Sequence, residues 1–356
     1  MVKWYDDKLL NKGRQPELDI AKGLAVLFMI AVHVLEAFST ASVMESNIGW
    51  LVEFLGGPPA APVFMFLLGI GIIYSKKSTA RNLLNRGLIL LLGGYLLNFI
   101  RGTLPNLILY WKNGQYSFYE KALDELIAVD ILQFAGLAFL FFALVRVLKL
   151  KKITIILLTA AFGVINLFAL TIETNHFIFS AFTGLIWGSS EISFFPFLSW
   201  IVYPAAGYLF GWYLMRCSDK RKFYFYLFLA SITLFIIATI IIVFIFKYDL
   251  GLSDQTRYYH HNLIGNIEFT AFVVSWISLL FFLTSVIPKT VSNTIKRWSN
   301  NLTEIYFIQW ILIGWIVMFT GHNTLNVSYY FLLFVGITIA SDLLAYTYKN
   351  RRIKIK

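Results

Sequence analysis

Ten stretches of the chain are long and apolar enough to cross a lipid bilayer as helices. Each holds about 20 residues with few charges, the length that a helix rising 1.5 Å per residue needs to cross the hydrocarbon layer. They lie at residues 19–40, 49–75, 84–101, 127–147, 153–172, 196–215, 223–246, 264–287, 303–321 and 327–347. The hydrophobic pattern therefore predicts an all-α, polytopic integral membrane protein that forms a single domain of about ten transmembrane helices over residues 1–356.

The second stretch is unusual for a membrane helix. Its sequence "GGPPAAPVFMFLLGIGI" places three prolines and two glycines in the first half, and these residues interrupt a regular helix. Irregular backbone at membrane depth persists only where protein or a water-filled cavity covers it. We expect a break at residues 56–62 that either borders a cavity or packs tightly against the first span. A simple helix kink at the prolines is the alternative interpretation.

Positive charge alternates between the two sides of this arrangement. Of the 30 Lys and Arg residues, 25 fall at one predicted side, in segments such as "KKSTARNLLNR", "RCSDKRK" and the tail "KNRRIKIK". The opposite side holds Arg101, Lys112, Lys121, Lys247 and Arg257. Because cytoplasmic loops carry the excess of Lys and Arg, we predict a multi-pass protein of the cell membrane with both termini in the cytoplasm.

The outward connections are the long ones, at about 102–126, 173–195 and 247–263, and they are rich in aromatic residues. These rings either form an interfacial aromatic belt or provide a surface on which sugars stack. We find no inverted repeat of the kind that marks many transporters.

Composition agrees with the membrane assignment, since 58% of the residues are hydrophobic, 14% are charged and the mean hydropathy is +0.71. The net charge of +11 lies in short clusters between apolar runs, where it acts as a topology signal, so we expect no nucleic-acid partner. The single cysteine, Cys217, excludes an internal disulfide, and its basic loop makes it a poor nucleophile candidate. The first apolar run is too long for a signal peptide, and we interpret it as a retained span.

The first span, "DIAKGLAVLFMIAVHVLEAF", carries three ionisable residues. Lys22 and His33 are eleven positions apart, which places them on one face of a helix at an axial separation of roughly 16 Å. Glu36 lies three residues beyond His33, close enough to orient its ring or to hold its proton. One face thus presents a cation at the inner end and a candidate general base in the outer third.

This arrangement suits a ligand that is anionic at one end and reactive at the other, and coenzyme A has both properties. Its phosphates would stay with the cytoplasmic cations Lys22, Arg81 and Arg86 while the pantetheine arm carries a thioester toward His33. The alternative is that Lys22 extends to the interface and that both arginines are topology markers.

Other polar residues are predicted to converge on the outer half of the bilayer. Arg101 ends the third span, Asp130 and Gln133 open the fourth, and Glu268 lies near the start of the eighth. Ionisable groups inside spans usually face protein or water and mark function. We expect Arg101, Gln133 and Glu268 to bind hydroxyl groups of an acceptor. Adjacent His260 and His261, which lack a second cluster, are interpreted as exposed loop residues rather than metal ligands.

At these positions the sequence resembles the transmembrane acyltransferase superfamily, which includes the acyltransferase-3 proteins and the heparan-alpha-glucosaminide N-acetyltransferase group. Lys22, ten residues and His33 match the basic-x10-His pattern of the acyltransferase-3 first span, with Lys in place of the usual Arg. Further stretches resemble the heparan-acetyltransferase-like branch. They are "APVFMFLLGIGI", "RGLILLLGGYLLN", "DILQFAGLAFL", "FPFLSWIVYPAAGYLFG" and "NNLTEIYFIQ".

The resemblance implies an acyl-CoA-dependent O- or N-acyltransferase. It moves an acyl group, expected to be acetyl, from cytoplasmic acyl-CoA to a hydroxyl or amino group of an extracytoplasmic sugar or glycan. By motif, His33 is the catalytic histidine and Lys22 the basic residue on the coenzyme A side. The lysosomal enzyme has its histidine in the first lumenal loop, but "MESNIGWLVEF" has none, so either His33 acts or an acid such as Glu53 contributes.

Two chemical routes follow for His33. Oriented by Glu36 or Asp130, it removes a proton from the attacking acceptor, or it forms a covalent acyl-histidine. Acetyl-CoA or another acyl-CoA is the expected donor, no metal is expected, and the lipid bilayer and the glycan acceptor are the expected partners. Homodimer formation is left open. The competing hypothesis is a proton-coupled transporter or exporter of a lipid or glycan, with His33, Glu36 and Asp130 as its relay, and an inactive ligand-binding homologue is a third.

Overall fold

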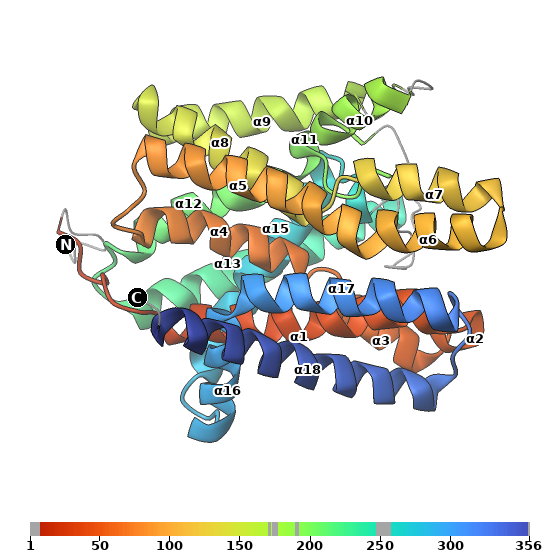
Figure 1. Ribbon diagram of the computed structural model, residues 1–356. Helices are drawn as coiled ribbons and strands as arrows, with labels where there is room; N and C mark the ends of the chain where they lie inside the picture. Colours follow the sequence, from red (N-terminus) through yellow and green to blue (C-terminus); the bar gives the residue numbers. More distant parts are fainter. Residues whose placement is uncertain (1–7, 170–171, 173–176, 189–191, 247–257, 355–356) are drawn as a thin grey trace. The chain divides into compact units, whose positions relative to one another are not determined.

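The computed structural model describes residues 8–169, 172, 177–188, 192–246 and 258–354 (Figure 1). It is 81% helical, and the described residues form no sheet, only the isolated bridges Ser39–Leu325 and Val129–Ser193. The predicted all-α class is confirmed. Inside a bilayer no water is present to pair backbone N–H and C=O groups. A helix pairs these groups within itself, which is why the long apolar segments are helical.

Eight helical stretches among the described residues are long and apolar enough to span a membrane, which confirms a polytopic architecture. They are Pro16–Phe38, Asn47–Tyr74, Ala80–Asn113, Lys152–Ala169, Lys220–Ile245, Leu263–Leu283, Leu302–Thr320 and Val327–Arg351. The predicted span 127–147 corresponds to α8 (Ile131–Val147), which has 17 residues. The predicted span 196–215 is divided into α11 (Phe197–Trp200) and α12 (Val202–Leu214). The total of ten transmembrane helices and the cytoplasmic location of both termini stay predictions.

The chain forms two compact units. Unit 1 contains residues 1–18, 62–94 and 128–285, and unit 2 contains residues 19–61, 95–127 and 286–356. Three of the boundaries fall inside helices, in α1, α4 and α5, and each unit is described by itself below.

Unit 1 contains most of α4 (Ala61–Tyr74) and most of α5 (Ala80–Asn98). It also contains all helices within residues 128–285. These are α8, α9 (Lys152–Ala169), α10 (Phe177–Ile186), α11, α12, α13 (Lys220–Ile240), the π-helix η2 (Ile241–Ile245) and α15 (Leu263–Leu283). Helices α4 and α12 cross at glycines: a Cβ on Gly69 would collide with the carbonyl oxygen of Pro204, and one on Gly207 with that of Phe66. Small residues permit this close backbone approach, as is usual between helices in membranes.

A buried ion pair connects the N-terminal segment of unit 1 to α13. The Lys220 ammonium donates to Glu17 at 2.8 Å and to Gln15 at 2.5 Å, and the Tyr224 hydroxyl donates to Glu17 at 2.9 Å. Glu17 is only 1% exposed, so its charge depends on these donors. The start of α1 is thereby fixed to the start of α13.

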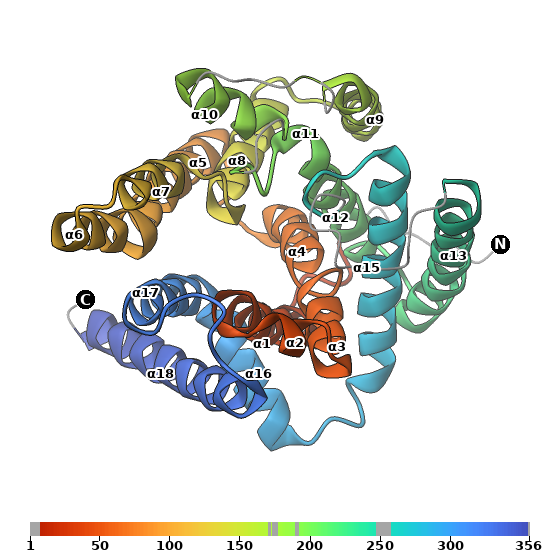
Figure 2. The same cartoon turned by 90° about the vertical axis from the view of Figure 1, so that its right-hand side faces the viewer.

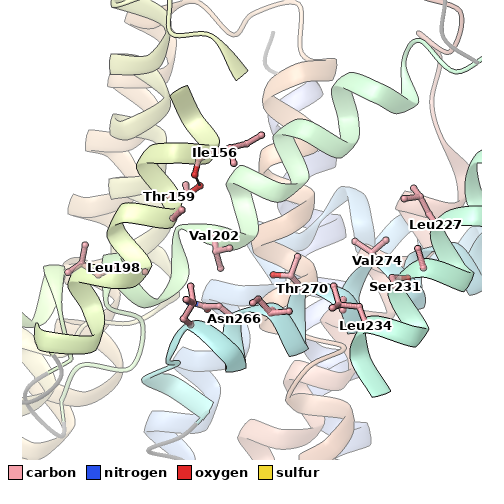
Figure 3. Close-up of a pocket in the computed structure, with 16 residues that line it drawn as sticks. Ile156, Thr159, Leu198, Val202, Leu227, Ser231, Leu234, Asn266, Thr270 and Val274 are labelled. Carbon is pink, nitrogen blue, oxygen red and sulfur yellow. Dashed lines mark hydrogen bonds between the residues drawn. The ribbon is translucent and has the colours of Figure 1, made fainter. Parts of the chain in front are cut away.

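An apolar pocket of about 450 Å³ lies in unit 1 between α9, α12, α13 and α15 (Figure 3). Its walls are mostly aliphatic, from residues such as Leu198, Val202 and Leu234. Asn266 Oδ1 and Thr270 Oγ1 line the same pocket and are buried without a hydrogen-bond partner among the described residues. The pocket is therefore an apolar space with an amide oxygen and a hydroxyl on one wall.

Unit 2 is built around α1 (Pro16–Phe38), of which it holds all residues from Asp19 onward. It also contains α2 (Ala41–Met44), α3 (Asn47–Gly56), the π-helix η1 (Phe99–Thr103), α6 (Leu104–Asn113), α7 (Tyr116–Ile127), α16 (Lys289–Asn300), α17 (Leu302–Thr320) and α18 (Val327–Lys354). Figures 1 and 2 show α17 and α18 as a pair beside α1. The Tyr330 hydroxyl of α18 donates to the carbonyl of Ala31 in α1 at 3.4 Å.

The predicted break in the second span is confirmed. Helix α3 ends at Gly56, residues 57–60 form turns, and α4 begins at Ala61. A Cβ on Gly56 would collide with the side chain of Val32 in α1. Of the two expectations for this break, tight packing against the first span is thus the one observed.

The predicted outward loop at 102–126 is wrong in its conformation, because this segment is largely helical. Helix α6 continues from α5 through η1 and ends at Asn113. Gly114, with a φ of 67°, follows it, and α7 begins at Tyr116. The positive φ favours glycine, so the "KNGQ" sequence sets the turn between two amphipathic helices. The other two predicted loops, 173–195 and 247–263, lie partly outside the described residues, which exclude 173–176, 189–191 and 247–257.

Candidate functional site

His33 lies in α1 of unit 2 and contacts α17. Its Nδ1 atom is 3.1 Å from the amide nitrogen of Gln309, whose side chain is completely buried. Which of the two atoms carries the proton depends on the tautomer of the imidazole and on the orientation of the amide. His33 itself is partly exposed, so its ring is held on one side by α17 and accessible on another.

Trp310 follows Gln309 in α17 and packs against the same imidazole. The two ring centroids are 4.0 Å apart, with an angle of 32° between the ring planes. The guanidinium carbon of Arg101 lies 4.0 Å from the centroid of the Trp310 ring. The indole therefore contacts both His33 and a cation, and we call these four residues, His33, Arg101, Gln309 and Trp310, the histidine cluster.

Arg101 enters this cluster from the π-helix η1, a rare conformation that frequently occurs at functional sites. The residue is only 8% exposed. A Cβ on Gly314 would collide with the carbonyl oxygen of Arg101, so the glycine allows α17 to lie directly against η1. The backbone contact places the Arg101 side chain beside Trp310, one turn earlier in α17.

Lys22 lies near the start of α1, where α16 packs. A Cβ on Gly23 would collide with the carbonyl oxygen of Ile295, and Ser299 donates a hydrogen bond to Asp19 at 3.3 Å. Unit 2 therefore holds Lys22, His33, Glu36, Glu53 and Arg101 of the predicted site residues.

The other predicted site residues belong to unit 1: Arg81, Arg86, Asp130, Gln133 and Glu268. Asp130 is the N-cap of α8, where its carboxylate accepts from the N–H of Ile131 at 2.7 Å. Gln133 completes the capping box by accepting from the N–H of Asp130 and by donating to the carbonyl of Ala128. Both side chains thus satisfy backbone groups at the start of α8.

The remaining predicted residues have varied surroundings. Glu268 is 5% exposed and accepts a hydrogen bond from Thr239 at 3.0 Å. Arg86 lies over the ring of Phe139, with 5.0 Å from its guanidinium carbon to the ring centroid, and Arg81 is exposed. Glu36 and Glu53 are both partly exposed.

The interpretation of His260 and His261 as exposed loop residues is wrong. His261 is 1% exposed and lies 3.3 Å from the hydroxyl of Tyr203, while His260 donates to the carbonyl of Ser193 at 2.6 Å. Burial lowers the pKa of His260, although the Ser193 carbonyl opposes this shift. Aromatic residues such as Trp200, Tyr203 and Phe269 pack around His261. Trp200 and Tyr203 are distant in the sequence, so the burial could not be predicted from the two adjacent histidines. The described residues contain no group of three metal-ligating side chains.

Cys217 is buried between the start of the chain and α12. Burial raises the pKa of its thiol to about 11, and Asn11 lies within 3.4 Å of the sulfur. The thiol is therefore protonated at neutral pH and unsuited to nucleophilic attack.

Sequence reasoning missed Gln309 and Trp310. A signal was present, because Gln309 is a polar residue inside an apolar span, and such residues mark function or helix contacts. What the sequence lacked was the pairing of α1 with α17, which are separated by more than 260 residues.

These features define a multi-pass helical membrane protein with an imidazole held inside one of its helical units. A sequence model of a family described as an acyltransferase domain matches residues 15–346. The chain therefore belongs to the acyltransferase-3 family, and it is a membrane acyltransferase. No curated protein and no solved structure matches the chain.

Proposed function

We propose that this protein transfers an acyl group, in the first place acetyl, from cytoplasmic acyl-CoA to a hydroxyl or amino group of an extracytoplasmic sugar. The observation that carries the proposal is the contact of His33 with Gln309 and Trp310, in a chain that belongs to an acyltransferase family. A general base for acyl transfer needs an imidazole that is fixed in orientation and still open to the substrate. His33 meets both requirements.

His33 acts as the base through Nε2. For this role Nδ1 must carry the other proton, and the Gln309 amide accepts it once the amide is turned so that Oε1 faces the ring. The acceptor oxygen or nitrogen attacks the thioester carbonyl and passes its proton to Nε2. The C–S bond then breaks, and the departing thiolate takes the proton from the imidazolium.

Arg101 is the proposed contact for the acceptor's hydroxyl groups. Its guanidinium lies over Trp310, which also packs on His33, so a sugar bound by Arg101 lies near the imidazole. Aromatic rings of the neighbouring α6–α7 pair, such as Tyr110 and Tyr119 at a centroid distance of 5.6 Å, offer apolar faces of the kind that stack on sugar rings. The heparan-acetyltransferase-like resemblance is compatible with an amino sugar as acceptor.

The two ends of the first helix give the reaction its direction. Lys22 and His33 are separated by roughly 16 Å along α1, and the charge pattern predicts that the Lys22 end is cytoplasmic. The phosphates of the donor then remain on the cytoplasmic side, and only the acyl group passes to the other side.

Purified protein incubated with radiolabelled acetyl-CoA and an amino sugar tests the proposal. We expect labelled sugar and released thiol from the wild-type protein and from Cys217→Ser, and neither product from folded His33→Ala. Unimpaired transfer by His33→Ala overturns the role of His33. Absence of coenzyme A binding under all conditions favours a transporter.

A further inference from the structure

The apolar pocket of unit 1 is bounded by small side chains on three helices. Ala160 and Gly163 of α9, Ala230 of α13 and Ala271 of α15 all line it. A larger side chain at any of these positions would fill part of the space. The volume of about 450 Å³ lies within the range of pockets that bind small molecules.

The rim of this pocket consists of apolar side chains that are exposed on the surface of the protein (Figure 3). Ile156 of α9 is 44% exposed and Leu234 of α13 is 46% exposed, and both line the pocket. Both helices belong to stretches that are long and apolar enough to span a membrane, so their exposed apolar side chains face lipid. A lipid hydrocarbon chain can therefore enter the pocket from the side.

Two of the four polar side chains in the wall already have partners. Thr159 donates to a carbonyl of its own helix at 2.8 Å, and the hydroxyl oxygens of Ser231 and Ser275 are 2.8 Å apart. The other two are Asn266 and Thr270, whose Oδ1 and Oγ1 atoms are buried without a hydrogen-bond partner among the described residues. An unpaired buried polar atom costs free energy, and a ligand that pairs it recovers that cost.

Asn266 and Thr270 lie one helical turn apart on α15, so their side chains are neighbours on one face of that helix (Figure 3). Asn266 is only 3% exposed. Its amide oxygen needs a donor, whereas the threonine hydroxyl can either donate or accept. A single hydroxyl group of a ligand can donate to Asn266 and pair with Thr270 at the same time.

The lining also limits the charge of the ligand. Among the described residues that line the pocket, none is charged. A phosphate or carboxylate placed there would be a buried charge without a counter-ion, which is strongly unfavourable. The polar group of the ligand is therefore neutral, and an alcohol is the smallest neutral group that matches both side chains.

The depth of the pocket agrees with a lipid that is oriented in a bilayer. Asn266 lies three residues after the start of α15, and Val274, which also lines the pocket, lies eight residues further on. At 1.5 Å per residue, the wall runs roughly 12 Å from Asn266 toward the middle of the helix. The charge pattern predicts that the start of α15 is on the outer side, so a hydroxyl at Asn266 would lie near the outer interface.

We infer that this pocket binds a neutral lipid that carries a free hydroxyl group next to a long hydrocarbon chain. The hydroxyl pairs with Asn266 and Thr270, and the chain occupies the apolar space between α9, α13 and α15. The pocket belongs to unit 1 and the histidine cluster to unit 2, so the inference is independent of the proposed acyl transfer.

The test uses hexadecanol with a photoreactive diazirine in its chain as the probe. The full-length protein is placed in nanodiscs of phosphatidylcholine, a lipid without hydroxyl groups. Competition by unlabelled hexadecanol and by its methyl ether measures the affinity for each, because the ether keeps the chain but cannot donate a hydrogen bond. We expect crosslinks in α9, α13 and α15, and an affinity for the alcohol on the order of fivefold higher than for the ether.

Two variants test recognition of the hydroxyl. Asn266→Leu removes the acceptor and should abolish the preference for the alcohol over the ether, and Thr270→Val should weaken it. Neither substitution removes a described side-chain hydrogen bond, so both variants should fold. Thr233→Val is the matched control, at an exposed threonine of α13 that does not line the pocket, and it should leave the preference unchanged.

A third variant tests the position of the chain. Ala160→Phe fills the pocket from an exposed position, and Ala161→Phe changes the neighbouring exposed alanine of α9, which does not line the pocket. Crosslinking should be lost in Ala160→Phe and retained in Ala161→Phe.

Three results overturn the inference. Equal crosslinking of Ala160→Phe and Ala161→Phe places the probe elsewhere, and equal competition by alcohol and ether shows an ordinary lipid chain. Absence of crosslinks in α9, α13 and α15 leaves water as the partner of the two polar side chains. Because the experiment contains no acyl-CoA, failure of acyl transfer does not alter its outcome.

Discussion

Replacing Gln309 by leucine isolates the contact that orients His33. The substitution replaces the amide by an apolar side chain of similar size at a position that is 0% exposed, and it removes the 3.1 Å contact to Nδ1. A hydrogen bond of this kind contributes about 1 kcal/mol, which corresponds to roughly a fivefold change in a rate or equilibrium. Loss of the ring's orientation lowers the rate further. The total loss is limited by the contribution of a general base, which is about 10²- to 10⁴-fold in rate. We expect kcat to fall by about tenfold.

The assay is steady-state acetyl transfer with the KM for acetyl-CoA measured alongside kcat. Because Gln309 contacts the imidazole and not the donor phosphates, the KM for acetyl-CoA should stay constant. Gln309→Glu separates the two orientations of the amide, since a carboxylate accepts from Nδ1–H but cannot donate to Nδ1. It should retain more activity than Gln309→Leu if His33 acts through Nε2.

Asn166→Leu is the matched control for loss of a buried amide. Asn166 is also 0% exposed in a spanning helix, α9, and donates to the carbonyl of His261 at 2.8 Å. It should lower the melting temperature in detergent and leave kcat unchanged. A wild-type kcat in folded Gln309→Leu refutes the positioning role of Gln309.

Three further predictions concern stability and reactivity in unit 1. Gly207→Ala should destabilise the protein by about 3 kcal/mol, because the new Cβ collides with the carbonyl of Phe66; a melting temperature equal to wild type contradicts this close crossing. Lys220→Met should cost about 2 to 3 kcal/mol by leaving the Glu17 carboxylate with fewer donors, and Glu17→Gln in the same background should recover part of that loss on thermal melting. Cys217, with a pKa raised to about 11 by burial, should resist iodoacetamide at pH 8 and react once the protein is unfolded, as measured by mass spectrometry; rapid labelling of folded protein rejects its burial.

Several local features could be predicted because they depend on short-range physics. The apolar runs predicted helices, since a chain in lipid must satisfy its own backbone groups. The glycines and prolines at residues 56–62 predicted a break, and the structure places that break against Val32. The segment 102–126 was missed as helix because its charges and aromatics lowered its hydropathy without removing its amphipathic period.

The candidate site depends on both kinds of information. The spacing of Lys22 and His33 marked α1, because helical geometry places both on one face whatever surrounds them. The residues that contact His33, Gln309 and Trp310, lie in a distant segment of the chain and could not be predicted from this spacing. Asp130 was expected to orient His33 and Gln133 to bind the acceptor; the structure shows that both side chains cap the helix that they start, and their predicted roles stay predictions.

The sequence by itself determined a helical membrane protein, the shared helix face of Lys22 and His33 and, through the family match, acyl transfer. Hydropathy, helical period and motif spacing are properties of contiguous residues, and they can be read along one chain. Only the tertiary structure brought Gln309 and Trp310 to His33, Arg101 to Trp310, and α16 to the Lys22 end of α1. Those contacts depend on which helices pack together and on the register of the packing. Glycines such as Gly23 and Gly314 contribute to both, because two backbones can approach closely only where no side chain lies between them.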